Sequence, residues 1–390
     1  MTLVDFIIIV VKAALIFGAL LQLAAFSTWI ERKGSALIQD RVGANRASIL
    51  GFDLAGLLNT LVADPVKAIL KEDFVPKGTT QFMHSLGPFL AVFPVLVSFA
   101  VVPFGPPIEF MGKEITLQLA NLNVGILYVF AMGSLAVYGV VLAGWVANNK
   151  FSLFGGLRAS AQMISYEVTL GISIVGIIAI YRTLDLNLII AQQNATTLFG
   201  VLPRWGVFLN PIGFLVFFMS MMAETKRAPF DLPESESELV AGYLTEYSGM
   251  KFLLFWLGEF AEIAVAAAFV TILFFGGWHL PYFDIQTLVQ PLATWLPDTP
   301  PYWPGFLSQT LGVEFMTALP SIIVAFLAAT IFGTKVFLFC VLQIIIRWTL
   351  PRFRYDQLMN LCWKILFPIS LLNLLVTIVL IIEGVYSYVE

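Results

Sequence analysis

The sequence predicts an all-α integral membrane protein. Hydrophobic residues make up 59% of the 390 residues and charged residues only 12%, well below the roughly 25% charged residues of a soluble domain. Mean hydropathy is +0.89. Eight apolar windows approach the roughly 20 residues that a helix needs to cross a bilayer, and none alternates as a membrane barrel strand does. The windows are residues 3–28, 83–104, 121–147, 159–181, 206–224, 252–277, 320–346 and 364–383.

The first window, residues 3–28, predicts a retained helix rather than a cleavable signal peptide. It is long, has no basic segment before it, and is followed by Glu31, Arg32 and Lys33. Neither an internal repeat nor a hydrophilic second domain is visible. We therefore expect residues 1–390 to form one polytopic membrane domain.

Lysine and arginine are unevenly distributed when alternate connections are assigned to alternate sides of the membrane. Cytoplasmic loops collect these residues, and the connections assigned to the outside hold only Lys113, Arg182 and Arg204. This asymmetry predicts that both termini lie outside. The cations assigned to the inside are Arg32, Lys33, Arg41, Arg46, Lys67, Lys71, Lys77, Lys150, Arg158, Lys226, Arg227, Lys251, Lys335, Arg347, Arg352, Arg354 and Lys364.

Two connections are too long to be simple turns. Residues 50–75 place leucine, valine and isoleucine at roughly helical spacing, which predicts an amphipathic helix at the inner interface or against a partner. Asp64 and Lys67 lie three residues apart there, and either an ion pair or a relay role is consistent with that spacing. The outer segment 278–318, rich in proline and aromatic residues, predicts irregular structure with short helical pieces.

Motifs for bound redox groups are absent from the sequence. Cys340 and Cys362 are too few and too isolated for a metal or iron–sulfur site, and His84 and His279 have no ligand spacing. There is no glycine-rich dinucleotide fingerprint and no Walker loop. We expect no bound metal, flavin or NAD in this chain.

The stretch "AETKRAPFDLPESESELVAGYLTEY", Ala223–Tyr247, carries six carboxylates between two apolar windows. We call residues 223–250 the acidic loop. Helix capping could explain two of the acids, with Asp231 as N-cap, Glu234 as its capping-box partner and Pro233 in the first turn, and a solvated charge run is a further explanation. However, "APFDLP" suggests burial, and confined carboxylates repel one another, which raises their pKa values. Raised values suit a proton relay.

Three further acids fall inside predicted spans. Glu167 lies in the fourth window, and Glu259 and Glu262 lie in the first turns of the sixth. An ionisable group at the helix centre costs at least about 2.5–3.5 kcal/mol, so each is a candidate for function. A structural pairing role is the alternative for Glu167, and a position at the membrane interface is the alternative for the other two.

The first inner connection reads "ERKGSALIQDRVGANRASILG". Its cations can be topology signals alone, and for Lys33 this is the better explanation. Gly34 and Gly43, together with the acids Glu31 and Asp40, indicate a tight ordered loop.

The segments "QDRVGANR", "ADPVKAILKED", "ISYEV" and "AETKRAPFDLPESESELVAGYLTEYSGMKFLLFWLGEF" resemble the quinone-site membrane subunit of respiratory complex I, the proton-translocating NADH:quinone oxidoreductase. Its mitochondrial members are called NADH dehydrogenase subunit 1. The resemblance covers roughly residues 5–383. It implies a bundle of about eight tilted helices without redox centres of its own. The substrate would be a quinone, ubiquinone or menaquinone.

The resemblance also implies partners and roles. The family forms a quinone chamber with two hydrophilic subunits of the iron–sulfur arm and starts an acidic path toward small membrane subunits and antiporter-like subunits, in a lipid bilayer and without nucleic acid. The residues matching its proton path are Glu224, Asp231, Glu234, Glu236, Glu238, Glu167 and Asp64. Those matching its quinone chamber are Arg32, Arg41, Arg227, Phe230, Glu246 and Tyr247.

Two departures limit the comparison. Ala44 stands in "DRVGAN" where the family usually has proline, so no role is carried onto Asn45, and nothing is carried onto residues 281–305.

A homologous membrane subunit of a nickel–iron hydrogenase or related non-NADH dehydrogenase is an alternative function. An autonomous secondary transporter is another, although it predicts an inverted repeat that is not visible. Chain length favours a bacterial inner membrane over a mitochondrial one.

Overall fold

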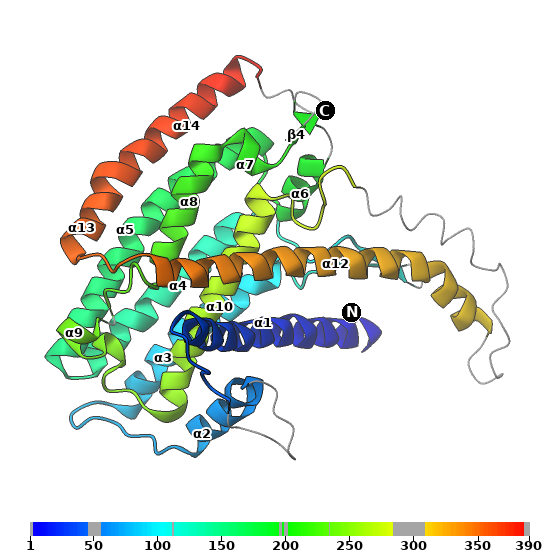
Figure 1. The fold of residues 1–390 in the computed structure, drawn as a ribbon. Helices are drawn as coiled ribbons and strands as arrows, with labels where there is room; N and C mark the ends of the chain where they lie inside the picture. Colours follow the sequence, from blue (N-terminus) through cyan, green and yellow to red (C-terminus); the bar gives the residue numbers. More distant parts are fainter. Residues whose placement is uncertain are drawn as a thin grey trace.

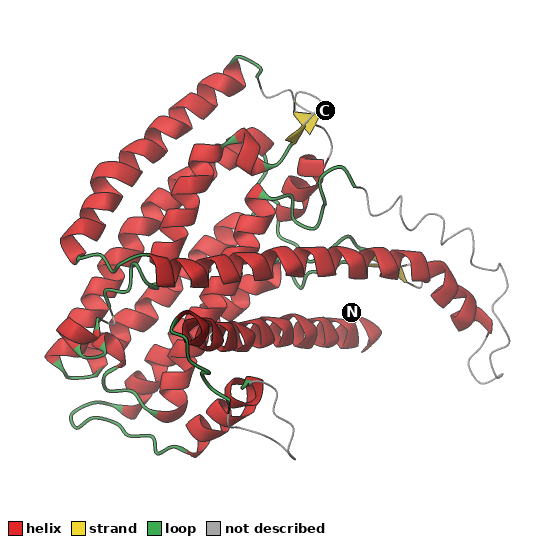
Figure 2. Cartoon of the chain, in the orientation of Figure 1, coloured by secondary structure: helices red, strands yellow, loops and turns green. Residues whose placement is uncertain are grey.

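The computed structural model describes residues 3–45, 56–110, 113–194, 197–198, 202–233, 235–283 and 309–385. Helices dominate it, and the strands are limited to two short hairpins (Figure 2). Among the described residues, seven helical segments are long and apolar enough to cross a membrane. This confirms the predicted all-α membrane class. The segments are α1 (Leu3–Ile38), α3 (Gln81–Ser98) with the 3-10 turn Phe99–Val101, α4 (Gly125–Val146), α5 (Lys150–Tyr181), α10 (Gly249–Phe274), α12 (Gln309–Thr349), and α13 (Tyr355–Asn360) continuing through the π-helix Leu361–Leu366 into α14 (Phe367–Ile382).

The predicted window 206–224 is divided between two shorter helices, α7 (Gly206–Leu209) and α8 (Pro211–Glu224). Pro211 lacks a backbone N–H and suits the first turn of a new helix. The Asn210 side chain caps that turn by accepting a hydrogen bond from Gly213 N at 2.9 Å. At 14 residues, α8 is shorter than the roughly 20 residues of a full span.

Shorter elements occupy the connections. Within the segment 50–75, residues 50–55 lie outside the described part, and the helical residues run from Asn59 to Leu70, as a π-turn and α2 (Asp64–Leu70). Of the outer segment 278–318, residues 284–308 also lie outside it, and α12 begins at Gln309. The other elements are β1 (Ile108–Phe110), β2 (Lys113–Ile115), α6 (Leu186–Asn194), β3 (Thr197–Leu198), β4 (Leu202–Pro203), α9 (Glu236–Leu239) and the 3-10 turn Gly242–Leu244.

Several helices extend past the apolar windows that predicted them. Glu31 to Gly34 belong to α1, so the prediction that "ERKG" forms part of a tight loop is wrong. Arg158 likewise lies inside α5. Hydropathy reports only where lipid or core surrounds a helix, whereas backbone hydrogen bonding continues the helix into polar residues. The charged side chains therefore project from fixed helical positions.

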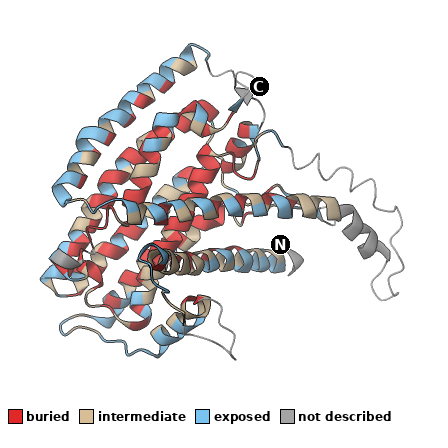
Figure 3. Cartoon of the chain, viewed as in Figure 1, coloured by how far each residue is buried: buried red, intermediate tan, exposed pale blue. Residues whose placement is uncertain are grey.

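The core is built around α10. Buried residues make up 89% of its most apolar 18-residue window, compared with 11% for α1. Figure 3 shows the buried positions concentrated in the central helices, whereas α1, α12 and α14 expose long faces. In Figure 1, α14 flanks α5 on one side of the molecule, and α1 and α12 lie on the other. Glycines allow the closest helix approaches: a Cβ at Gly139 of α4 would lie 2.4 Å from Ala91 N of α3.

Lys335 corrects one topology assignment. Its Nζ donates to the carbonyl oxygens of Phe275, Gly277 and His279 at 2.8, 2.9 and 2.6 Å, just beyond the C-terminal end of α10. That end belongs to the connection predicted to lie outside, so placing Lys335 among the inner cations was wrong. Its position in the middle of an apolar window gave no information about which end of α10 it contacts.

Candidate functional site

Glu31, in the C-terminal half of α1, lies in a largely buried ionic network. It pairs through Oε2 with Arg227, from the acidic loop, and through Oε1 with Arg347, near the end of α12. The Glu31 and Arg227 side chains are 16% and 10% exposed. Because isolated charges are costly to bury, each one here depends on its partners. One carboxylate thus joins three segments that are far apart in the sequence.

Arg227 also connects this network to α10. Its Nη2 lies 3.7 Å from Glu259 Oε2, and its guanidinium carbon lies 3.9 Å from the centre of the Phe260 ring. The Tyr243 hydroxyl donates to Glu259 Oε1 at 3.0 Å. Two buried acids and one shared arginine thus lie between α1 and α10. We call this set the arginine network: Glu31, Arg227, Arg347, Glu259 and Tyr243.

Asp231, in the middle of the acidic loop, pairs with a different arginine. Arg352 Nη2 lies 2.8 Å from Asp231 Oδ2. The nearest helix, α9, begins at Glu236 with Ser235 as N-cap, so the predicted capping role of Asp231 is wrong. Burial raises the pKa of Asp231, and the Arg352 guanidinium opposes that shift. Within the part that the structure describes, Asp231 Oδ1 has no hydrogen-bond partner.

The acidic loop is held against α5 by Gln162. Its side-chain Nε2 donates to the carbonyl oxygens of Ala223 and Phe230 at 2.7 and 2.8 Å. The Phe230 ring packs between Tyr166 of α5 and Phe353 after α12. The two ends of the segment that carries Arg227 are therefore fixed to a single side chain of α5.

Carboxylates also meet in a central cavity of about 80 Å³ among α3, α4, α5, α8 and α10. Its lining is apolar except for a few groups that include Glu224, Thr225 and Glu262. A Cβ at Gly133 would lie 3.4 Å from Glu224 Oε1, so the carboxylate rests against α4. On the next residue of α4, the Ser134 hydroxyl donates to Glu167 Oε1. A cavity of this size has room for several waters.

A second, larger hollow of about 310 Å³ opens beside α2, and we call it the α2 pocket. In it, Arg32 pairs with Asp64 through Nη1 and Oδ2 and lies 5.2 Å from the Trp256 ring centre. The partner of Asp64 is thus Arg32 of α1, whereas the sequence pointed to Lys67. The lining residues are Arg32, Asp64, Lys67, Ala68, Lys71, Tyr247, Ser248, Gly249, Phe252, Leu253 and Trp256.

Tyr247 is fixed in the wall of the α2 pocket by His84 of α3. The two rings stack with centroids 4.2 Å apart and planes 8° from parallel. His84 Nε2 lies 3.2 Å from the Glu246 carbonyl oxygen, and His84 Nδ1 lies 3.1 Å from Lys251 Nζ. Asn149 donates to Glu246 Oε1 at 2.8 Å. Burial raises the pKa of the Tyr247 hydroxyl, so the group stays protonated near neutral pH.

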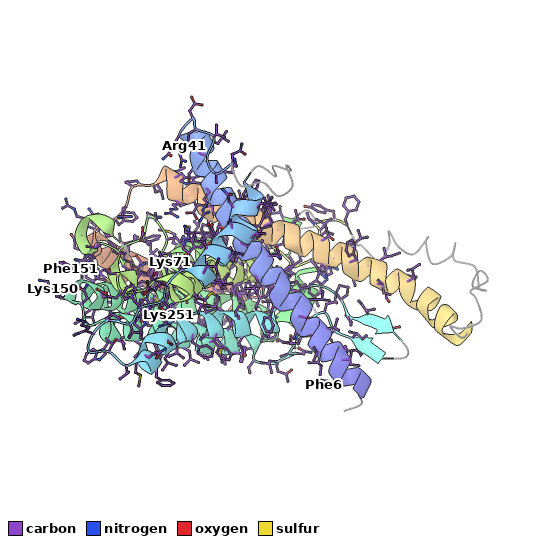
Figure 4. All side chains as sticks on the ribbon, turned by 90° about the horizontal axis from the view of Figure 1, so that it is seen from below. Phe6, Arg41, Lys71, Lys150, Phe151 and Lys251 are labelled. Atoms are coloured by element: carbon purple, nitrogen blue, oxygen red, sulfur yellow. The ribbon has the colours of Figure 1, made fainter. Side chains whose placement is uncertain are left out.

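Some predicted residues lie apart from these groups. The Glu238 side chain is 51% exposed and pairs with Arg158 at 2.6 Å. Arg41 lies beyond the end of α1, away from the bulk of the chain (Figure 4), and its Nε donates to Gln39 Oε1 at 2.7 Å. Glu234 and the side chain of Glu236 lie outside the described part of the structure.

Sequence reasoning missed several members of these clusters. Arg347 and Arg352 were interpreted only as topology signals, and Glu31 only as part of a loop. Tyr243 and His84 carried no motif. A charged or polar residue that folding buries gives little local signal, because its partner lies far along the chain. The separation between Arg347 and Glu31 is 316 residues.

Comparison with known proteins identifies the family. The family model described as NADH dehydrogenase matches residues 11–378. A Geobacter metallireducens protein named as an NADH-quinone oxidoreductase subunit, of the type designated H, is 42% identical over 373 residues, covering 96% of each chain. A Cytophaga hutchinsonii protein of the same name is 40% identical over 362 residues, covering 93% of each chain. The match spans nearly the whole chain, and so this protein belongs to the NADH dehydrogenase family.

Proposed function

We propose that this chain is the membrane subunit of a proton-translocating NADH:quinone oxidoreductase, in which it forms part of the quinone chamber and begins a proton path. The relatives named as NADH-quinone oxidoreductase subunits support this, because similarity extends over more than nine-tenths of the chain. Electrons would reach the quinone from other subunits, since the sequence carries no motif for a redox group of its own.

The α2 pocket is the proposed contribution to the quinone chamber. A quinone has a flat apolar ring and two carbonyl oxygens, and it enters from lipid. The pocket offers Trp256, Phe252 and the Tyr247 ring for apolar contact and Arg32 and Lys67 as donors. Arg227 and Phe230 are proposed to support the chamber from the acidic loop, together with Arg41 and Glu246.

The observation that carries the proposal is a series of neighbouring charged side chains that runs from the α2 pocket to the central cavity. Arg32 of the pocket is adjacent in α1 to Glu31, and Arg227 links Glu31 to Glu259. One helical turn further along α10, Glu262 lines the central cavity with Glu224. A negative charge formed on quinone would act strongly on these carboxylates, because charges interact more strongly in the low-dielectric interior than in bulk water. Redox chemistry could thereby change the proton occupancy of the cavity.

The proposed setting is a bacterial inner membrane with both termini on the periplasmic side. Partners would be the two hydrophilic subunits that complete the quinone chamber, small membrane subunits and antiporter-like subunits. The related proteins are bacterial, and the helical spans are those of a multi-pass protein. The names of the relatives favour this assignment over a component of a hydrogenase. Activity of the chain reconstituted alone would instead support a transporter.

Glu224→Gln is the direct test. The substitution keeps the side-chain shape but cannot ionise, so we expect NADH:quinone turnover and proton uptake to fall together by about tenfold or more, which corresponds to about 1.4 kcal/mol of barrier. Turnover is measured in membrane vesicles containing the assembled enzyme, and proton uptake with a pH-sensitive dye. Glu109→Gln, at an exposed position in β1, is the matched control. Unchanged turnover and unchanged proton stoichiometry in Glu224→Gln would contradict the proposed proton path.

His84→Ala tests the quinone pocket. Removing the imidazole removes the stacking partner of Tyr247 and a contact to the Glu246 carbonyl. The Tyr247 ring should become less ordered, and we expect the KM for a short-chain quinone to rise severalfold, about 1 kcal/mol, with a smaller change in kcat. Phe82→Ala, on the same helix but 69% exposed, provides the comparison. Equal KM values in the two variants would show that Tyr247 is not part of the quinone site.

A further inference from the structure

Lys226 is a buried cation with an unusual backbone conformation. It follows the C-cap Thr225 of α8 and has a φ of 55°, in the left-handed region that is unfavourable for a residue other than glycine. Its side chain is only 4% exposed, and its Nζ lies 3.4 Å from Glu262 Oε2. A solvated lysine would gain nothing from this conformation. The backbone instead directs the ammonium group toward α10.

Glu262 lies between the two groups of carboxylates already described. It is one turn after Glu259 on α10, so both face the same side, and it interacts electrostatically with Lys226, Glu259 and Arg227. Its carboxylate also lines the central cavity beside Glu224. The Lys226–Glu262 pair therefore lies between the arginine network and the cavity.

The charges around Glu224 do not balance. Glu224 interacts electrostatically with two other carboxylates, Glu262 of α10 and Glu167 of α5, and with one cation, Lys226. Arg227, the next residue, is already paired with Glu31 and Glu259. Glu224 and Glu262 line the same cavity beside Lys226, and like charges disfavour each other's charged form in a confined site. The position of Lys226 therefore influences which of the two carboxylates carries a proton.

We propose that Lys226 and Glu262 form a charge pair that sets the protonation of Glu224. When Lys226 remains close to Glu262, the two charges largely cancel and Glu224 keeps its proton. When Glu262 takes up a proton from the side of the arginine network, the ammonium is no longer balanced by Glu262 and acts on Glu224, which then gives up its own proton to water in the central cavity. Lys226 and Glu262 are positioning residues in this scheme, and Glu224 carries the proton. The inference rests on the proposed function and adds a control element to it.

The two members of the pair make opposite predictions for the pH dependence of turnover. Lys226→Met removes the ammonium that balances Glu262, so Glu224 should hold its proton more strongly and the pH profile of coupled turnover should move to higher pH. Glu262→Gln removes the carboxylate nearest to the ammonium, so the ammonium should act more strongly on Glu224 and the profile should move to lower pH. Each shift should be about one pH unit, as expected for a charge within 4–6 Å. The double variant Lys226→Met with Glu262→Gln should return close to the parent profile.

The experiment measures NADH:quinone turnover and proton uptake of the assembled enzyme in membrane vesicles across a range of pH. A purely structural ion pair would lower the amount of assembled enzyme in both single variants without shifting their profiles in opposite directions. Shifts in the same direction, or none, overturn the inference. If Lys226→Met does not assemble, Glu262→Gln decides the question because it is isosteric: an unmoved profile overturns the inference. Glu262→Asp and Lys226→Arg keep the charges and should keep the profile.

Glu224→Gln separates this inference from the proposed function. Lost turnover in that variant, combined with unmoved profiles in the charge variants, would remove only the role of Lys226 and Glu262. Unchanged turnover in Glu224→Gln would remove the proton path itself, and any shift in the charge variants would then belong to another group. Glu109→Gln, exposed and remote from the cavity, controls for a general effect of removing a carboxylate.

Discussion

Arg227→Ala is expected to abolish coupled NADH:quinone turnover. The substitution leaves Glu259 without its arginine and leaves Glu31 with only Arg347. Breaking a buried ion pair by removing one partner costs about 3–5 kcal/mol. If the assembled enzyme loses that energy from the transition state, turnover falls by roughly a hundredfold or more. The measurement is the rate per assembled enzyme, with the amount of assembly read from a native gel.

Two further variants distinguish the loss of the guanidinium contacts from a general effect of removing a positive charge. Arg227→Lys keeps the charge but offers one ammonium where the guanidinium contacts both Glu31 and Glu259, so an intermediate rate is expected. Lys150→Ala removes an exposed cation at the start of α5 and should leave the rate within about twofold of the parent, as surface substitutions usually do. If Arg227→Ala retained full turnover, the arginine network would have no role beyond helix packing.

Gly155→Ala is expected to prevent normal assembly. A Cβ at Gly155 of α5 would lie 2.6 Å from Gly242 Cα and 2.7 Å from Tyr243 N, both backbone atoms of the 3-10 turn. Overpacking of this kind costs about 1–3 kcal/mol or more, and here it would also displace the Tyr243 hydroxyl from Glu259. We expect less assembled enzyme in the membrane and lower turnover in what assembles.

The same helix supplies the control. Gly171 also lies in α5, and a Cβ there would have nothing within 4 Å. Gly171→Ala should therefore assemble normally, because alanine is at least as favourable as glycine inside a helix. Both variants are made identically and compared on one native gel. Equal assembly of Gly155→Ala and Gly171→Ala would show that the 3-10 turn can move to accommodate the added methyl group. The close approach of α5 to this turn would then not be required for assembly.

The fold class could be predicted because hydropathy is a local property. Each long apolar window needs only its own residues to identify a helix long enough to cross a membrane, and seven such helices are present in the described part of the chain. The helix limits were less predictable, as the charged end of α1 shows. The break at Pro211 explains why one window contains two helices where a single span was expected.

The candidate site was predictable only in part. Motif resemblance pointed to Glu224, Asp231 and Arg227, since these lie within one continuous stretch. It could not indicate that Asp231 pairs with Arg352 or that Glu31 lies between two arginines, because these contacts depend on how α1 and α12 pack around the acidic loop. The helix-capping explanation for Asp231 was wrong for this reason: it considered only neighbouring residues, whereas the carboxylate pairs with an arginine far along the chain.

The three carbonyl contacts of Lys335 and the ion pairs of α10 respond differently to proton transfer. The carbonyl contacts attach the region just beyond the C-terminal end of α10 to α12, whereas the ion pairs of Glu259 and Glu262 hold the middle of the helix. Carbonyl contacts do not depend on carboxylate protonation, but ion pairs do. Proton transfer would therefore change the attachment of the middle of α10 and leave the attachment of its C-terminal end unchanged.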